Sequence, residues 1–196
     1  MTTNELSRRT VLSAPALLSL SGSATASIDT IMPAQSGCAK ALVAYFSRSG
    51  NTRVIAGTIQ RLLDADVFEI RAAQAYPDDY EATVERARRE RDGGFEPALA
   101  ATVPDIAAYD TVFLGFPIWG ETTPPVIRTF LRAHNLAGNT IRPFITHGGY
   151  GLGSSRAVLA DHAPNARIEP PFSMEADQER RTLNQVRTWL SAAEDQ

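Results

Sequence analysis

The feature that most constrains the fold of this chain is a regular alternation of short apolar runs with segments of helical periodicity. Residues 41–46 form a continuous apolar run of the kind expected for a strand buried on both faces of a sheet. The next segment places apolar residues at helical spacing, at Ile55, Ile59, Leu62 and Leu63. Further strand-like segments follow at 66–71, 110–116, 140–146 and 166–170.

This order of segments predicts a doubly wound α/β fold. Strands separated by helices need crossover connections, which are right-handed in nearly all proteins, so the chain builds a parallel sheet covered on both faces. No segment of 20 to 50 residues repeats, which excludes a solenoid. Five strands in a chain of 196 residues favour the strand order 2-1-3-4-5 over the six-stranded dinucleotide-binding order.

Three helices are predicted after the second strand. Residues 80–91 form a highly charged segment in which Glu85 and Arg89 can pair, and it is interpreted as a solvated helix. Thr123 is expected to cap a helix whose first residue is Pro124. Apolar residues at helical spacing near the end of the chain, up to Leu190, predict a closing helix.

The first 26 residues have the layout of a signal peptide, with Arg8-Arg9 before a short apolar run and small residues at its end. They resemble a twin-arginine export signal; an ordinary secretory signal and a disordered tail are the alternatives. The apolar run is too short and too polar for a membrane span. Residues 27–39 are read as a linker, in which Cys38 is an unpaired cysteine or a lipid attachment site. The expected location is the periplasm or the exterior.

Composition disfavours two classes of function. The formal net charge is only −3, and the basic residues are spread along the chain, so no nucleic acid partner is expected. The single cysteine and the three histidines lack the spacing of metal ligands, so no metal site is expected.

The turn between the first strand and the first helix is suited to a phosphate. Gly50 lets the backbone approach closely, the helix N-terminus is positive, and three hydroxyl side chains can donate hydrogen bonds. The residues of this turn are Ser47, Arg48, Ser49, Gly50, Asn51 and Thr52. The loop lacks the Gly-Lys-Ser/Thr ending of ATP-binding loops and the glycine spacing of dinucleotide loops, which favours a phosphate monoester. Arg48 either supports the phosphate or points to solvent.

This turn resembles the phosphate loop of the flavodoxin family, which binds flavin mononucleotide (FMN). Residues 109–120 resemble the family's third strand and the loop beyond it, and residues 146–153 resemble its second flavin-contacting loop. Tyr76-Pro77 and Tyr80 also fit, so the resemblance covers the predicted domain, 40–192, and is greatest to short bacterial flavodoxin-like proteins. One departure is the segment 120–125, where many relatives keep a further aromatic residue or glycine.

The resemblance implies FMN as cofactor and assigns the remaining site residues to two loops. They are Pro117, Ile118, Trp119 and Gly120 after the third strand, and Thr146, His147, Gly148, Gly149 and Tyr150 after the fourth. Trp119 is expected to stack on the flavin ring, with an ordinary packed tryptophan as the alternative. Gly120 either presents its carbonyl to flavin N5 or is a plain turn glycine. His147 either stabilises the reduced ring or is a simple loop histidine.

Three functions are consistent with the sequence. The first is an electron-transfer flavoprotein. The second is an FMN-dependent NAD(P)H:quinone-type reductase, in which the flavin supplies the chemistry. The third is a flavodoxin-like binding module without redox activity. Whether the protein is an enzyme is left open, and its redox partner or small-molecule acceptor is unidentified.

Overall fold

The computed structural model describes residues 40–175 and 179–194. The predicted signal peptide, the linker and Cys38 lie outside these residues. The elements, in chain order, are β1 (Ala41–Tyr45), α1 (Asn51–Leu63), β2 (Asp66–Glu69), α2 (Tyr80–Asp92), a 3-10 turn (Ile106–Ala108), β3 (Thr111–Pro117), α3 (Pro125–Ala133), β4 (Thr140–His147), α4 (Ser155–His162), β5 (Arg167–Ile168), β6 (Phe172–Glu175) and α5 (Glu179–Glu194).

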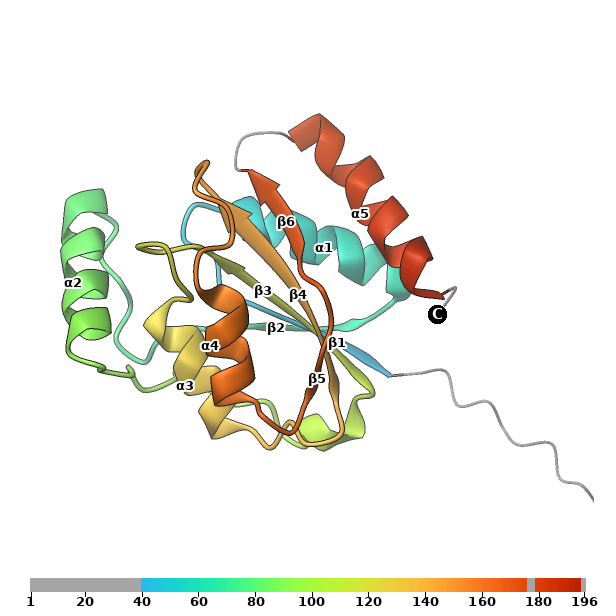
Figure 1. Cartoon of the computed structure of the whole chain (residues 1–196), viewed down its shortest axis with the longest axis horizontal. Helices are drawn as coiled ribbons and strands as arrows, with labels where there is room; N and C mark the ends of the chain where they lie inside the picture. Colours follow the sequence, from blue (N-terminus) through green and yellow to red (C-terminus); the bar gives the residue numbers. More distant parts are fainter. Residues whose placement is uncertain (1–39, 176–178, 195–196) are drawn as a thin grey trace, which may run out of the picture. The chain divides into compact units, whose positions relative to one another are not determined.

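The strands form one parallel sheet in the order β2-β1-β3-β4-β5, which confirms the predicted fold class and strand order. Helices α1 and α5 cover one face of the sheet and α3 and α4 cover the other, whereas α2 lies apart from it beyond α3 (Figure 1). The buried side chains accordingly form two clusters, one on each face. Alternate residues of β1 enter different clusters, Leu42 one and Val43 the other, as the pleat of a strand requires.

The fifth position of the sheet is filled by two short strands. β5 pairs with the start of β4, and β6 pairs with Phe144–His147 further along the same strand. Pro170 and Pro171 lie between them. Because proline has no N–H to donate, two consecutive prolines interrupt the ladder. The sequence predicted one weak strand at 166–170 and missed β6.

Two helix predictions need correction. Helix α3 begins at Pro125, with Pro124 before it in extended conformation at φ −55° and ψ 143°. The predicted cap at Thr123 is therefore wrong: its side chain is buried and makes no hydrogen bond within the described residues. The cause is the second proline, since a residue that precedes proline is disfavoured in helical conformation.

Helix α2 contains the predicted pair, with Glu85 Oε1 3.6 Å from Arg89 Nη1. Asp79 caps it by accepting a hydrogen bond from the N–H of Ala82. The helix is not wholly solvated, however, because Glu90 is only 6% exposed. Across residues 40–175 and 179–194, no helix is both long and apolar enough to span a bilayer.

Candidate functional site

The turn after β1 closes around the side chain of Ser47. Ser47 Oγ accepts hydrogen bonds from the N–H of Gly50, at 3.1 Å, and from the N–H of Arg53, at 3.4 Å. Gly50 precedes α1 with φ +99°, a conformation that favours glycine. The N–H groups of Asn51 and Thr52 belong to the first turn of the helix, where no carbonyl of the helix can accept from them. The turn therefore presents free donors and a positive helix end, as an anion site requires.

Thr52 has a structural partner that the sequence did not indicate. Its side chain is buried, and its Oγ1 lies 2.9 Å from Oγ1 of Thr146 at the end of β4. The carbonyl of Thr146 also accepts from the N–H of Ile118, at 2.8 Å. Thr146 thus joins the turn after β1 to the loop after β3, and brings parts of all three predicted segments together.

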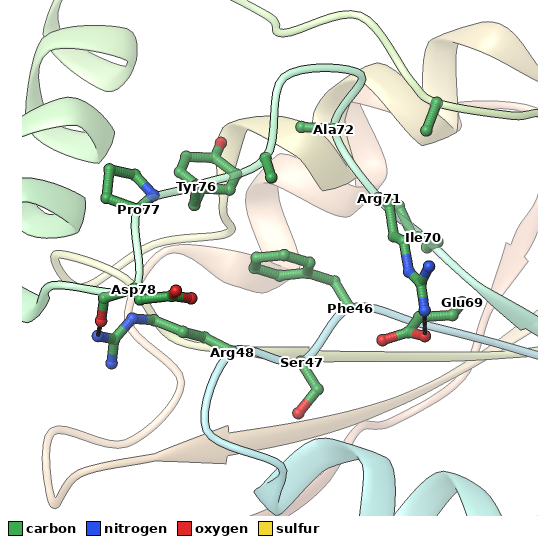
Figure 2. Close-up of a pocket in the computed structure, with 12 residues that line it drawn as sticks. Phe46, Ser47, Arg48, Glu69, Ile70, Arg71, Ala72, Tyr76, Pro77 and Asp78 are labelled. Carbon is green, nitrogen blue, oxygen red and sulfur yellow. Dashed lines mark hydrogen bonds and ion pairs between the residues drawn. The ribbon is translucent and has the colours of Figure 1, made fainter.

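Arg48 points toward the segment that precedes α2. Its Nη2 donates to the carbonyl of Asp78 at 2.9 Å (Figure 2). Its guanidinium lies 5.4 Å from the ring centre of Tyr80. In this conformation the guanidinium of Arg48 binds a backbone carbonyl outside the turn of residues 47–52.

A cavity of about 360 Å³ adjoins the same turn on the side of β2. It is lined by residues 46–48, 69–72 and 75–78, and by Ala100 (Figure 2). Of the predicted site residues, only Ser47 and Arg48 line it; the loops after β3 and β4 do not.

Glu69 is one of two acidic residues that line this cavity, the other being Asp78. Glu69 lies 2.7 Å from Arg53 Nη2 and also pairs with Arg71. Burial alone would raise the pKa of Glu69, but the hydrogen bonds from both arginines outweigh it and hold the pKa below its usual range. The carboxylate therefore stays ionised and fixes α1 against the end of β2.

The loop after β3 contains a tight turn. Pro117 ends β3, and the backbone groups of Trp119 and Thr122 exchange two hydrogen bonds, of 3.0 and 3.3 Å. Gly120 and Glu121 between them have φ +55° and +62°, so both central residues are left-handed. This conformation suits glycine, but it costs free energy at Glu121. Strain of this kind is common where a loop must hold a ligand.

The loop after β4 is docked onto that turn. The carbonyl of Glu121 accepts from the N–H of Ser154 at 3.0 Å, and the hydroxyl of Ser154 donates to Thr122 Oγ1 at 2.7 Å. A Cβ on Gly153 would lie 1.9 Å from the Glu121 oxygen, so only glycine allows this approach. The two loops predicted to hold the flavin therefore form one unit.

Trp119 is partly buried and packs against two aromatic rings. Its ring centre lies 5.1 Å from that of Phe46 and 4.9 Å from that of Tyr76, both in edge-to-face geometry. Phe46 and Tyr76 line the cavity and form an aromatic wall of it, and Trp119 packs against both rings. The sequence did not predict this role for Phe46, because it continues the apolar run of the first strand.

His147 is held on both ring nitrogens. Its Nδ1 accepts from the N–H of Gly149 at 3.2 Å, and its Nε2 lies 3.0 Å from the hydroxyl oxygen of Ser173. These contacts favour a role in shaping the loop. Gly148 and Gly149 precede Tyr150, which is 79% exposed. No cluster of metal-ligating side chains occurs in the part of the chain that the structure describes.

The fold and these loops define a class: a doubly wound α/β protein whose first turn presents free backbone donors at a helix N-terminus and whose adjoining loops, after β3 and β4, present an aromatic ring. The loops lie at the carboxyl ends of β1, β3 and β4, on the two sides of the point where the strand order reverses, which is where ligands bind in such sheets.

Comparisons with known proteins agree with this class. A family model described as flavodoxin matches residues 40–193. A protein assigned as a flavoprotein from Bacteroides eggerthii DSM 20697 is 32% identical, with a TM-score of 0.67, over 78% of this chain and 96% of that one. A flavoprotein from Lactobacillus acidophilus NCFM, solved in complex with FMN, is 20% identical, with a TM-score of 0.60, over 74% and 98%. No curated protein matches the chain. The chain belongs to the flavodoxin family.

Proposed function

We propose that this protein binds FMN and acts in electron transfer. The observation that carries the proposal is the turn of residues 47–52, which ends a buried strand, opens a helix and leaves backbone N–H groups free to donate. The Lactobacillus acidophilus flavoprotein, which shares this fold, was solved with FMN. The flavin supplies the redox chemistry when bound, and the chain supplies binding, orientation and exclusion of water.

The residues present fit such a cofactor. The N–H groups of Asn51 and Thr52 and the hydroxyls of Ser47 and Ser49 would hold the phosphate, without a lysine. Ser47 Oγ accepts two hydrogen bonds from the loop, so its own O–H is still available to donate outward. The positive end of α1 complements the phosphate charge.

The flavin ring would lie against the joined loops after β3 and β4. Trp119 offers an aromatic face there, and its edge-to-face neighbours limit its rotation. Gly120 and Gly149 have positive φ and let the backbone approach a ring closely. Tyr150, which is largely exposed, would cover the ring from the solvent side.

A reductase is the second candidate, and the cavity beside Phe46 and Tyr76 is the observation that favours it. A protein that only carries electrons needs no pocket for a small molecule, whereas a volume of about 360 Å³ is in the range of ligand sites. An acceptor there would be separated from the flavin by the aromatic wall.

One experiment tests the cofactor and separates the two functions. The purified protein is mixed with FMN, and its visible spectrum is recorded during stepwise reduction and again with NADH or NADPH and a quinone. An FMN-bound protein that is reduced reversibly without consuming nicotinamide is an electron carrier. Rapid nicotinamide oxidation identifies a reductase. A protein that stays colourless with FMN contradicts both proposals and leaves a binding module.

We also propose that residues 1–26 direct export through the twin-arginine pathway. Arg8-Arg9 before a mildly apolar run support this proposal. That pathway moves folded proteins, so a cofactor can be inserted before transport. Cell fractionation of the full chain is the test: the protein is expected in the periplasm or medium, and the R8K/R9K variant in the cytoplasm. Export that is unchanged in this variant contradicts the proposal.

A further inference from the structure

A buried carboxylate, Glu90, lies on helix α2, most of which is charged and exposed. The side chain of Glu90 is only 7% exposed, and a carboxylate buried to this extent is costly unless it is paired. Its partners are the hydroxyl of Tyr76, which donates to Oε2 at 2.6 Å, and Nε of Arg86, which donates to Oε1 at 2.7 Å. Burial and the neighbouring Glu90 raise the pKa of Tyr76 well above its usual range, so its hydroxyl keeps its proton and stays a donor.

The same cluster fixes the segment that precedes α2. Arg86 donates to the carbonyl of Ala75 at 2.7 Å and to that of Gln74 at 3.1 Å, and its guanidinium lies 4.4 Å from the ring centre of Tyr76. The hydroxyl of Thr83 donates to the carbonyl of Pro77 at 2.6 Å. Four consecutive residues, 74–77, are therefore tied to one helix.

Tyr76 connects this cluster to Trp119 through a contact between their rings. The two rings meet edge to face, with their planes at 88° and their centres 4.9 Å apart. Helix α2 reaches the same turn at a second point, where Nη1 of Arg91 lies 3.4 Å from the carbonyl oxygen of Gly120. Since α2 otherwise lies apart from the sheet, these contacts link it directly to the turn after β3 (Figure 1).

We propose that Glu90 is a positioning residue, which acts through Tyr76 to hold Trp119 and its turn in the orientation that receives the flavin ring. The inference rests on the proposed function. On this proposal, contacts from α2 determine how the protein holds the flavin ring, whereas the turn of residues 47–52 recognises the phosphate. Changes at Glu90 should therefore alter the interaction with the ring and not the preference for a phosphate.

The test compares FMN with riboflavin, which has the same ring and no phosphate. Glu90→Ala and Tyr76→Phe are expected to weaken the binding of both flavins by the same factor, roughly 2- to 10-fold, as for the loss of one aromatic contact. Both variants should also shift the midpoint potential of bound FMN, because a displaced Trp119 contacts the oxidised and the reduced ring differently. A purely structural role would lower the thermal stability without moving this potential. Glu90→Gln, which keeps one acceptor oxygen, should fall between Glu90→Ala and the wild type.

Arg89→Gln is the matched control, because Arg89 lies on the same helix with its side chain 68% exposed and, among the described residues, forms an ion pair only with Glu85. It should change neither affinity nor potential. If Glu90→Ala fails to fold, Tyr76→Phe, which keeps the ring, decides the question. Variants that bind both flavins with wild-type affinity and potential overturn the role of Glu90 alone. A wild-type protein that binds neither flavin overturns the proposed function and, with it, this inference.

Discussion

Gly153 holds the loop after β4 against the turn after β3, and replacing it with alanine should separate them. The new Cβ would lie 1.9 Å from the oxygen and 2.5 Å from the carbonyl carbon of Glu121, both of which are backbone atoms that cannot rotate away. Gly153 also has φ +51°, which alanine rarely adopts. Two penalties therefore act at one position.

Alanine variants of two neighbouring glycines separate the cost of backbone strain from the cost of the close contact. Gly151 has φ +68° but open space around its Cβ position, so Gly151→Ala should lose about 1 kcal/mol of unfolding free energy from backbone strain, after the gain from a stiffer unfolded chain. Gly148 has neither penalty, so Gly148→Ala should be neutral or stabilising by about 0.5 kcal/mol. Gly153→Ala adds overpacking against backbone, for a total loss of about 2–4 kcal/mol.

Equilibrium urea unfolding of the three variants at pH 7 measures these values, and a titration with FMN measures the effect on the site. Gly153→Ala is expected to weaken FMN binding more than Gly151→Ala, because it alone parts the two loops. If Gly153→Ala and Gly151→Ala lose the same stability, within about 0.5 kcal/mol, the contact with Glu121 does not constrain the loop and the docking of the two loops is refuted.

Two further predictions concern the contacts that hold the turn after β1. Thr52→Val and Thr146→Val should each lower the free energy of unfolding by about 1–3 kcal/mol, because each leaves the other hydroxyl buried without its partner. In urea unfolding, the double variant should lose less than the sum of the two single losses. Strictly additive losses would contradict the pairing. Glu69 has a lowered pKa in the folded protein, so its stabilising effect is present above the ordinary value of about 4.3 and is lost as the pH falls through the folded pKa. The difference in unfolding free energy between wild type and Glu69→Gln should therefore shrink between about pH 5 and pH 3, and a difference that is constant with pH would count against the ion pairs with Arg53 and Arg71.

The sequence predicted those parts of the fold that depend on local pattern. The strand at 41–46 could be recognised because a strand buried on both faces is apolar without alternation, and α1 because Ile55 and Ile59 recur on one face; both side chains are fully buried. The parallel sheet followed from the crossover rule, and its strand order from the number of strands. The prediction was less accurate at two pairs of consecutive prolines, one at the start of α3 and one between β5 and β6, because proline shifts a helix start and interrupts a strand.

The site was predictable as a set of loops but not as a set of contacts. Thr52 and Thr146 are 94 residues apart in the chain, so no local pattern indicates that their hydroxyls meet. Glu90 lies in a run of charged residues that reads as a solvated face, and only the fold shows that Tyr76 and Arg86 bury and pair it. The charge of a residue alone does not indicate its burial, because burial depends on partners supplied by tertiary structure.

The central claim is that the turn of residues 47–52 binds a phosphate, and the ratio of FMN to riboflavin affinity tests it most directly. Two charge-assisted hydrogen bonds from this turn should make FMN bind at least about 100-fold more tightly than riboflavin. Ser49→Asp, which places a negative charge in the turn, should abolish that preference, whereas Ser191→Asp, which adds the same charge on α5, should keep it. Equal affinity for the two flavins in the wild type, or an unchanged preference in Ser49→Asp, would show that this turn does not bind the phosphate.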